Sequence, residues 1–305
     1  MGAVLPRLLG ATVAGVVTSA VRGWLDNAAP GGQARWTRTN HRGEPVSLLE
    51  GPAVASGLLV GAAVGSGGGR AGAAVAVATA GAAAFGIVDD LAEDPDGKRK
   101  GLRGHLGALA RGELTTGGLK VLGIGASALV AAALALPRTG SRTAHVGDVL
   151  ASGALVAGTA NLVNLLDLRP GRALKAVTLA SAPLVAAPGA AGGVAAAVVG
   201  ASGAAFPSDL AETDMLGDGG ANALGAAVGT ALVLGAPRRV RLAALGVVLA
   251  LTVASERISF TRVIERTPVL RDVDRWGRRP AHVPVAGPDA PVTGSGAPRS
   301  GPTPA

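Results

Sequence analysis

The sequence has 305 residues, of which 49% are hydrophobic and 16% are charged, against about 25% charged residues in soluble proteins. This composition and a mean hydropathy of +0.42 argue against an ordinary soluble domain. The net charge of +8 does not indicate nucleic-acid binding, because the cations lie between apolar runs and aromatic residues make up only 2% of the chain. With no Cys, the chain has no disulfides, thiolate metal sites or cysteine nucleophiles.

Nine apolar segments follow one another along the chain, and each predicts a helix. They cover residues 3–25, 51–69, 71–88, 117–137, 145–166, 173–188, 190–206, 221–237 and 241–258. Their composition of Ala, Val, Leu and Gly is typical of membrane helices that pack through small side chains. The sequence therefore predicts an all-α fold, a polytopic integral membrane bundle of about nine transmembrane helices over residues 1–258.

The cations predict the orientation of this bundle, because cytoplasmic loops of membrane proteins are enriched in Lys and Arg. The loops after the odd-numbered segments hold most of them, which makes that side cytoplasmic and the protein a multi-pass plasma-membrane protein. The other side carries Arg7, Arg70, Arg138, Arg142, Arg238, Arg239 and Arg241. Because the last three crowd one short loop, the topology after residue 220 changes if segment 221–237 does not span.

Residues 259–279 predict a basic amphipathic cytoplasmic segment in which Thr267-Pro268 starts a helix. One face of that helix is apolar and comprises Val269, Leu270, Val273 and Trp276. The opposite face is basic and comprises Arg271, Arg275 and Arg278. We expect the segment to lie on the anionic membrane surface, with a partner helix as the alternative. Residues 280–305 are rich in Pro and Gly and predict a disordered tail.

Acidic residues recur where apolar segments end. Asp89-Asp90 follow segment 71–88, and their loop also carries Lys100 and His105. Adjacent acids at a helix C-terminus are unfavourable unless a cation is bound, although acids can also merely solvate a helix end. Lys100 is suited equally to binding phosphate or to setting orientation.

A second cluster lies near the end of segment 145–166, where Asn161, Asn164 and Asp167 are spaced by three residues and share one helical face. Their amides fit recognition of a nucleobase or ribose, or alternatively packing between helices.

The third cluster is Gly217-Asp218-Gly219-Gly220, before segment 221–237. The glycines allow a ligand close to the backbone, and the following helix N-terminus offers free N–H groups for a phosphate; a plain Gly-rich turn is the alternative. The loop from Asp209 to Asp218 holds four acids and no cation, so it needs neutralisation by a metal or by the basic loops. Magnesium fits carboxylates combined with substrate phosphates. Counting helices places all three clusters on the cytoplasmic side.

Together these segments resemble the polyprenyl-phosphate N-acetylhexosamine-1-phosphate transferases, which include phospho-N-acetylmuramoyl-pentapeptide transferase. The resemblance spans roughly residues 35 to 225. It rests on F-G-x-x-D-D at Phe85 to Asp90, N-x-x-N-L-x-D at Asn161 to Asp167 and G-D-x-G-x-N-x-L-G at Gly217 to Gly225. The stretch Asn40 to Pro45 is similar to the family's first cytoplasmic loop.

The resemblance implies a Mg²⁺-dependent enzyme, with Mn²⁺ as the alternative ion, that transfers a sugar 1-phosphate from a UDP-sugar to polyprenyl phosphate in the membrane and releases UMP, in cell-envelope glycan synthesis. It also allows a homodimer. The implied catalytic residues are Asp89, Asp90 and Asp218, and the implied metal ligands are Asp218 and Asp90. The implied substrate-binding residues are Asn161, Asn164 and Asp167 for the nucleotide, and Lys100, Arg42 and His105 for the phosphates.

Two departures indicate a divergent member of that family. Leu168 stands where the family commonly has Gly, and Ser255 to Pro280 lacks the His-rich motif of better-known members. Two other functions stay open. Intramembrane acids also mark transporters, and a catalytically inactive relative can serve as an assembly scaffold.

Overall fold

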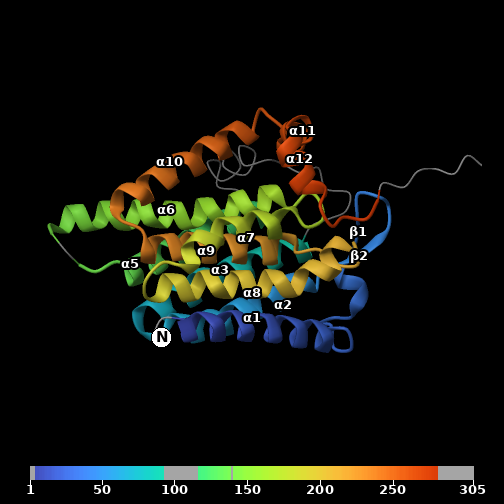
Figure 1. The fold of residues 1–305 in the computed structure, drawn as a ribbon, viewed down its shortest axis with the longest axis horizontal. Helices are drawn as coiled ribbons and strands as arrows, with labels where there is room; N and C mark the ends of the chain where they lie inside the picture. The colour runs from blue at the N-terminus through green and yellow to red at the C-terminus, as the bar shows by residue number, and fades with distance from the viewer. Residues whose placement is uncertain (1–3, 93–115, 139, 281–305) are drawn as a thin grey trace, which may run out of the picture.

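The computed structural model describes residues 4–92, 116–138 and 140–280, and most of these residues form long antiparallel helices (Figure 1). The helices are α1 (Val4–Leu25), α2 (Glu50–Ser66), α3 (Gly69–Ala92), α5 (Thr116–Ala135), α6 (Arg142–Leu166), α7 (Arg172–Val185), α8 (Ala190–Leu210), α9 (Gly217–Gly235), α10 (Arg238–Ser255), α11 (Phe260–Arg266) and α12 (Pro268–Arg275). A short antiparallel hairpin, β1 (Thr37–Thr39) and β2 (Pro45–Ser47), lies at one end of the bundle.

Within the described residues, each of the nine predicted apolar segments coincides with one helix, from α1 to α10. In the part of the chain that the structure describes, five helices are long and apolar enough to cross a membrane, namely α1, α3, α5, α6 and α8. Helix α10 joins α11 at a bend of 99°, and the pair counts as a sixth span if it is taken as one broken span. The predicted membrane helix bundle is therefore confirmed in outline, while nine spans and their orientation stay predictions.

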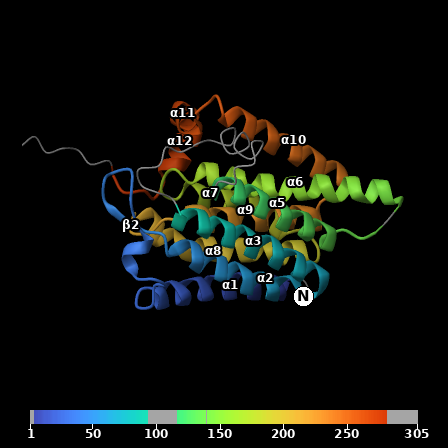
Figure 2. The ribbon, with the colours of Figure 1, turned by 180° about the vertical axis from the view of Figure 1, so that it is seen from behind.

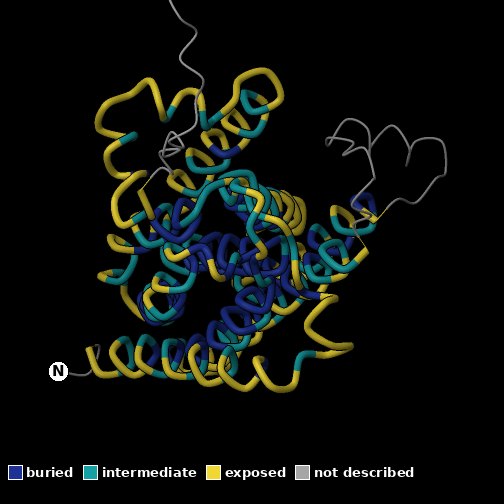
Figure 3. The backbone as a smooth tube through the Cα atoms, turned by 90° about the vertical axis from the view of Figure 1, so that its right-hand side faces the viewer, coloured by how far each residue is buried: buried dark blue, intermediate teal, exposed yellow. Residues whose placement is uncertain are grey.

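Small side chains set the spacing of the helices. Gly61 of α2 packs against Ala14 of α1, and Gly65 of α2 lies against Gly193 of α8. Because Gly and Ala add little bulk, neighbouring backbones approach closely, as in membrane helix pairs. Figure 3 looks along the bundle and shows the buried residues gathered between the helices, with the outer faces of α1 and α10 exposed.

The two boundary changes that matter for the site are extensions of helices. Helix α3 continues to Ala92, so that Asp89 and Asp90 lie in its last turns rather than after it. Helix α9 begins at Gly217, so that the expected Gly-rich loop is its first turn. Pro188 and Gly189 lie in the turn between α7 and α8, and Pro183 lies inside α7.

The hairpin closes the end of the bundle where α3 and α6 finish and α9 starts. We call this end the site end; it lies at the right of Figure 1 and at the left of Figure 2, which shows the molecule from behind. Ser47 of β2 forms a bridge with Asp214, and the Ser47 carbonyl accepts the N–H of Met215 at 2.9 Å. The hairpin therefore fixes the α8–α9 loop in place.

The C-terminal segment, residues 259–280, folds back over the site end. It forms two short helices instead of one, and α12 begins at Pro268 as expected. Arg172 of α7 binds the buried Asp274 carboxylate through Nε at 2.8 Å and Nη2 at 3.2 Å. Arg278, expected on the basic outer face, instead donates to Asp274 and to the Pro170 carbonyl. The apolar face stays exposed and comprises Val269, Leu270, Val273 and Trp276.

Candidate active site

The first and third acidic clusters meet on a lysine. Lys120, in the first turns of α5, places its Nζ 2.7 Å from Asp89 Oδ2 and in direct contact with Asp218 Oδ2. The three side chains keep between 18% and 26% of their surface exposed, so the group is reachable from solvent. One ammonium thus lies between two carboxylates that are 129 positions apart in numbering, from Asp89 to Asp218.

Asp90 has a different role from its neighbour. Its Oδ1 accepts the N–H of Asp218 and its Oδ2 accepts the N–H of Gly219, both at 2.9 Å. These are free N–H groups of the first turn of α9, so Asp90 caps that helix and favours its positive end. The sequence predicted these groups for a substrate phosphate; in the structure, the N–H groups of Asp218 and Gly219 donate to a carboxylate of the protein.

Glycines make this close approach of α3 and α9 feasible. Gly86 lies directly against the Asp218 carbonyl, where a Cβ atom would collide with backbone. Gly217 has a φ of 58°, a left-handed conformation that favours glycine, and a Cβ there would lie 2.9 Å from Asp90 Oδ2. The glycines of the third motif therefore fit helix packing around Asp90 as much as they fit a ligand.

The second cluster faces the same acidic group. Asp167 follows the last residue of α6, and its pKa is raised by burial and then by the negative charges of Asp209, Asp218 and Asp90. An N–H from Gly217 partly offsets this shift. Carboxylates of all three sequence clusters thus interact at the site end.

The amides of this cluster remain available for a ligand. Asn161 and Asn164 are partly buried in the last turns of α6. Among the described residues, neither side chain has a hydrogen-bond partner. Two amides with unused donors and acceptors can recognise a nucleobase or a sugar.

The acids of the α8–α9 loop are neutralised by the protein itself. Arg22 donates to Asp214 at 2.7 Å and 2.9 Å, and Arg42 Nε donates to both oxygens of Glu212 at 2.9 Å and 3.0 Å. Asp209 accepts the N–H of Gly171 at 2.6 Å. Arginines therefore compensate the charges of Asp214 and Glu212, while Asp209 is held by a backbone N–H.

Arg42 was implied to bind the substrate phosphates, but in the structure its guanidinium contacts other parts of the protein. Besides Glu212, its guanidinium donates to the carbonyls of Arg279 and Pro280 in the C-terminal segment, at 3.1 Å and 3.0 Å. Its charge is thus compensated, and it holds the hairpin loop to two other segments. The structure shows Arg42 as an organising residue of the site end.

Two of the implied substrate-binding residues, Lys100 and His105, lie outside the described residues. Lys120 was not selected from the sequence as a site residue. A signal was present, since Lys120 is the one charged residue between Thr116 and Ala135, and charged residues within apolar helices are usually functional.

The carboxylates fit a magnesium ion only in a shared site. In the described part of the chain, no three His, Asp or Glu side chains are arranged to hold a metal ion by themselves. Asp89 and Asp218 nevertheless place two partly exposed carboxylates around one positive group, and magnesium commonly takes one or two carboxylates and completes its shell with water and substrate phosphates. The pair fits such an ion held together with a diphosphate substrate.

The geometry gathers Asp89, Asp90, Asp167, Asp218 and Lys120 at the end of an apolar helix bundle. A comparison with models of known protein families finds no match to this chain. A comparison with curated proteins likewise finds none that is significantly similar to it.

Proposed function

We propose that the protein transfers a sugar 1-phosphate, an N-acetylhexosamine 1-phosphate by its resemblance, from a UDP-sugar to polyprenyl phosphate at the cytoplasmic face of the plasma membrane. The observation that carries the proposal is the contact of Lys120 with both Asp89 and Asp218. These carboxylates come from two of the three motifs that resemble the transferase family, and the third motif supplies Asp167 nearby.

The reaction requires a phosphate oxygen of the lipid to attack the sugar-bearing phosphorus of the UDP-sugar while the diphosphate bond breaks and UMP leaves. A bound Mg²⁺ would neutralise charge on the diphosphate. Lys120 supplies a fixed cation at the same place, and positioned positive charge is the main protein contribution to phosphoryl transfer. The ammonium and its two carboxylates thus form the reaction centre.

The two neighbouring acids of α3, Asp89 and Asp90, have different roles in this proposal. Both oxygens of Asp90 accept backbone N–H groups, so Asp90 positions the first turn of α9. Asp89 instead interacts with the side chains of Lys120, Asp218 and Thr116, and it is one-fifth exposed. Asp89 is therefore the group available to take a proton from the lipid phosphate, and Asp218 is the group available to a metal ion.

A single assay tests the proposal. Purified protein is incubated with Mg²⁺, polyprenyl phosphate and a panel of UDP-N-acetylhexosamines, and UMP release is measured. Asp218→Asn and Asp89→Asn should each reduce kcat by about 10²-fold or more, the scale of positioned acid–base or charge effects. The matched control is Asp272→Asn, an exposed acid of the C-terminal segment, which should retain the parent rate.

A folded parent protein that releases no UMP with any sugar, or an Asp218→Asn variant as active as the parent, would contradict the proposal. If the parent is active and Asp218→Asn is equally active, the protein is an enzyme but its active site lies elsewhere. A folded parent that releases no UMP would favour the inactive scaffold.

Transport is the second candidate, and Glu50 favours it. This carboxyl is 1% exposed, and neither oxygen has a partner among the described residues. Buried acids without partners mark ion pathways in transporters. Glu50, however, begins α2 at the site end, whereas the core between the ends of the bundle is built from Ala, Val and Leu. Uptake of labelled substrate by proteoliposomes, lost in Glu50→Gln, would establish transport.

A further inference from the structure

We propose that the opposite end of the bundle binds the phosphate group of a membrane lipid. A cavity of about 240 Å³ lies there between the α5–α6 and α9–α10 connections. We call it the distal pocket, and its walls include Pro137, His145, Asp148, Pro237, Arg238 and Arg241. Since one water molecule occupies about 30 Å³ of liquid, the pocket has room for a phosphate group and part of its hydration shell.

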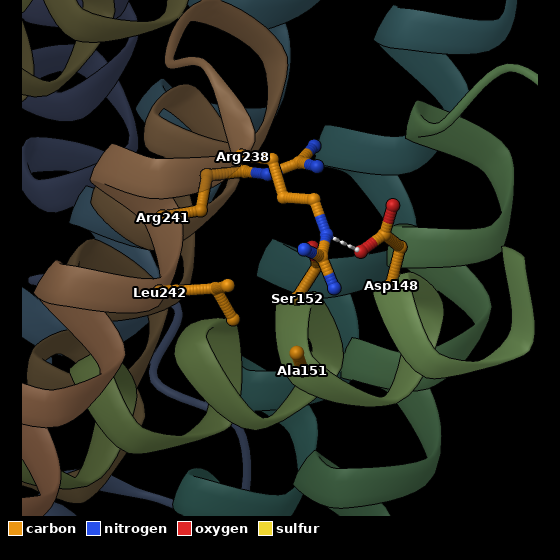
Figure 4. Close-up of a pocket in the computed structure, with 6 residues that line it drawn as sticks. All are labelled: Asp148, Ala151, Ser152, Arg238, Arg241 and Leu242. Atoms are coloured by element: carbon orange, nitrogen blue, oxygen red, sulfur yellow. Dashed lines mark hydrogen bonds and ion pairs between the residues drawn. The ribbon is translucent and has the colours of Figure 1, made fainter. Parts of the chain in front are cut away.

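The charge of the distal pocket points to an anion. Arg238 Nε donates to Asp148 at 2.6 Å, and Figure 4 shows this side chain reaching from α10 to α6. Arg241 lines the same space one turn later and has no acidic partner among the described residues. The distal pocket therefore contains two arginines and one carboxylate, which leaves an uncompensated positive charge. An arginine fork pairs well with phosphate oxygens.

The surrounding cations strengthen this charge. Arg138 and Arg142 flank the α5–α6 connection, and Arg239 lies between the two pocket arginines in sequence. In the described part of the chain, none of these three forms an ion pair. Helices α6 and α10 begin here and α5 and α9 end here, so the helix dipoles oppose one another and the arginine side chains set the charge. The net result is a strongly positive end of the molecule.

The position of the pocket identifies a lipid as the source of the phosphate. It lies at the ends of α5 and α6, two helices that can cross a membrane. Beside the arginines, Leu242 of α10 and Ala151 of α6 line the adjoining hollow, and Leu242 keeps 39% of its surface exposed. A headgroup at the arginines would thus place its acyl chains against the apolar surface that begins at Leu242. Basic pockets between membrane helices bind anionic headgroups in this way.

A lipid site also gives a reason for the arginines at this end. The predicted outer side of the bundle otherwise has few Lys and Arg residues. Cations on the predicted outer side oppose the usual orientation signal. A bound lipid phosphate gives them a role there that is independent of topology.

The test measures lipid binding by the purified full-length protein in neutral detergent, using native mass spectrometry with phosphatidylglycerol or phosphatidylcholine. We expect phosphatidylglycerol to bind preferentially, and the preference to weaken as ionic strength rises. Arg241→Gln should weaken phosphatidylglycerol binding about tenfold, the loss expected for one charged hydrogen-bonded contact. Arg241→Lys should retain most of the affinity, because it keeps the charge.

The matched control is Arg239→Gln, which removes the same charge from an exposed neighbour that does not line the distal pocket. Its affinity for phosphatidylglycerol should stay within about twofold of the parent, because no direct contact is lost. Equal binding of the two lipids by the parent, or equal losses in Arg239→Gln and Arg241→Gln, would overturn the proposal. Inorganic phosphate distinguishes the source. If millimolar phosphate displaces the lipid, the pocket is a site for the free anion, and the lipid assignment is wrong.

Discussion

At the scale of single residues, Lys120 shows how one cation can define a site. Its ammonium is shared by Asp89 and Asp218, and it is four-fifths buried. In such an environment a charge is screened less than in water, so an ion group of this kind is stable only when its members compensate each other. The sequence contained each of the three residues, but their meeting depends on how α3, α5 and α9 pack.

Gly86 and Gly125 give opposite expectations for the same substitution. Gly86→Ala places a methyl group into the backbone of α9 beside Asp218 and should lower stability by about 1–3 kcal/mol, as overpacking does. Gly125→Ala lies in α5 with open space around it and should raise stability by about 0.5–1 kcal/mol, because Ala is the better helix former.

Thermal unfolding in detergent, followed by circular dichroism, measures both changes. A Gly86→Ala protein that melts at or above the parent temperature would show that α3 and α9 are not in the close contact described here. The Gly125→Ala variant serves as the control for the general effect of replacing a helical glycine.

At the scale of elements, the C-terminal segment is held to the bundle by charge. The apolar face of α12 is turned away from the protein, and its attachment depends on Asp274, which Arg172 and Arg278 bind. An amphipathic pattern alone predicts which face is apolar. It does not decide which face meets the protein, and here the polar face does so because the buried Arg172 of α7 binds the Asp274 carboxylate.

This attachment should depend on pH. Burial raises the pKa of Asp274, but the hydrogen bonds and charge of Arg172, with the charge of Arg278, outweigh burial and leave the pKa below its ordinary value. Because the carboxyl is more acidic when the segment is bound, its contribution is complete above the ordinary pKa of about 4. It is lost as the pH falls through the lowered value.

A label reports the release of the segment. The chain contains no Cys, so Thr267→Cys provides a single site for a dye whose anisotropy reports the mobility of the segment. Asp274→Asn should lower the anisotropy already at neutral pH. The free energy that holds the segment to the bundle should fall by about 3 kcal/mol, because the substitution leaves Arg172 buried and without its anion. Asp272→Asn changes an exposed acid two residues earlier in the same helix, and this variant should have the anisotropy of the parent. Equal release of the segment in both variants would contradict this attachment.

At the scale of the whole molecule, the two ends differ in charge. The site end gathers acids and the cations that bind them, and the opposite end carries arginines around the distal pocket. We expect the site end to be cytoplasmic. In intact cells, a membrane-impermeant maleimide should label Thr143→Cys at the opposite end and should label Thr39→Cys on β1 only after permeabilisation. The reverse pattern would invert the topology and remove cytoplasmic UDP-sugars as substrates for this site.

The positions of the helices follow from the order of apolar residues along the chain. Long runs of Ala, Val, Leu and Gly satisfy their backbone hydrogen bonds only as helices in an apolar setting, and every such run is a helix in the structure. The same order of residues also places the acids at one end, since their spacing along an antiparallel chain returns them to the same side.

Which of these residues meet depends on how the helices pack against one another. The pairing of Lys120 with two acids, the capping of α9 by Asp90 and the use of Arg42 on Glu212 all join residues far apart in sequence. Local periodicity carries no information about such pairs, because it fixes the face of a helix and not its neighbour. The close approaches permitted by Gly86 and Gly217 select the neighbour, and with it the site.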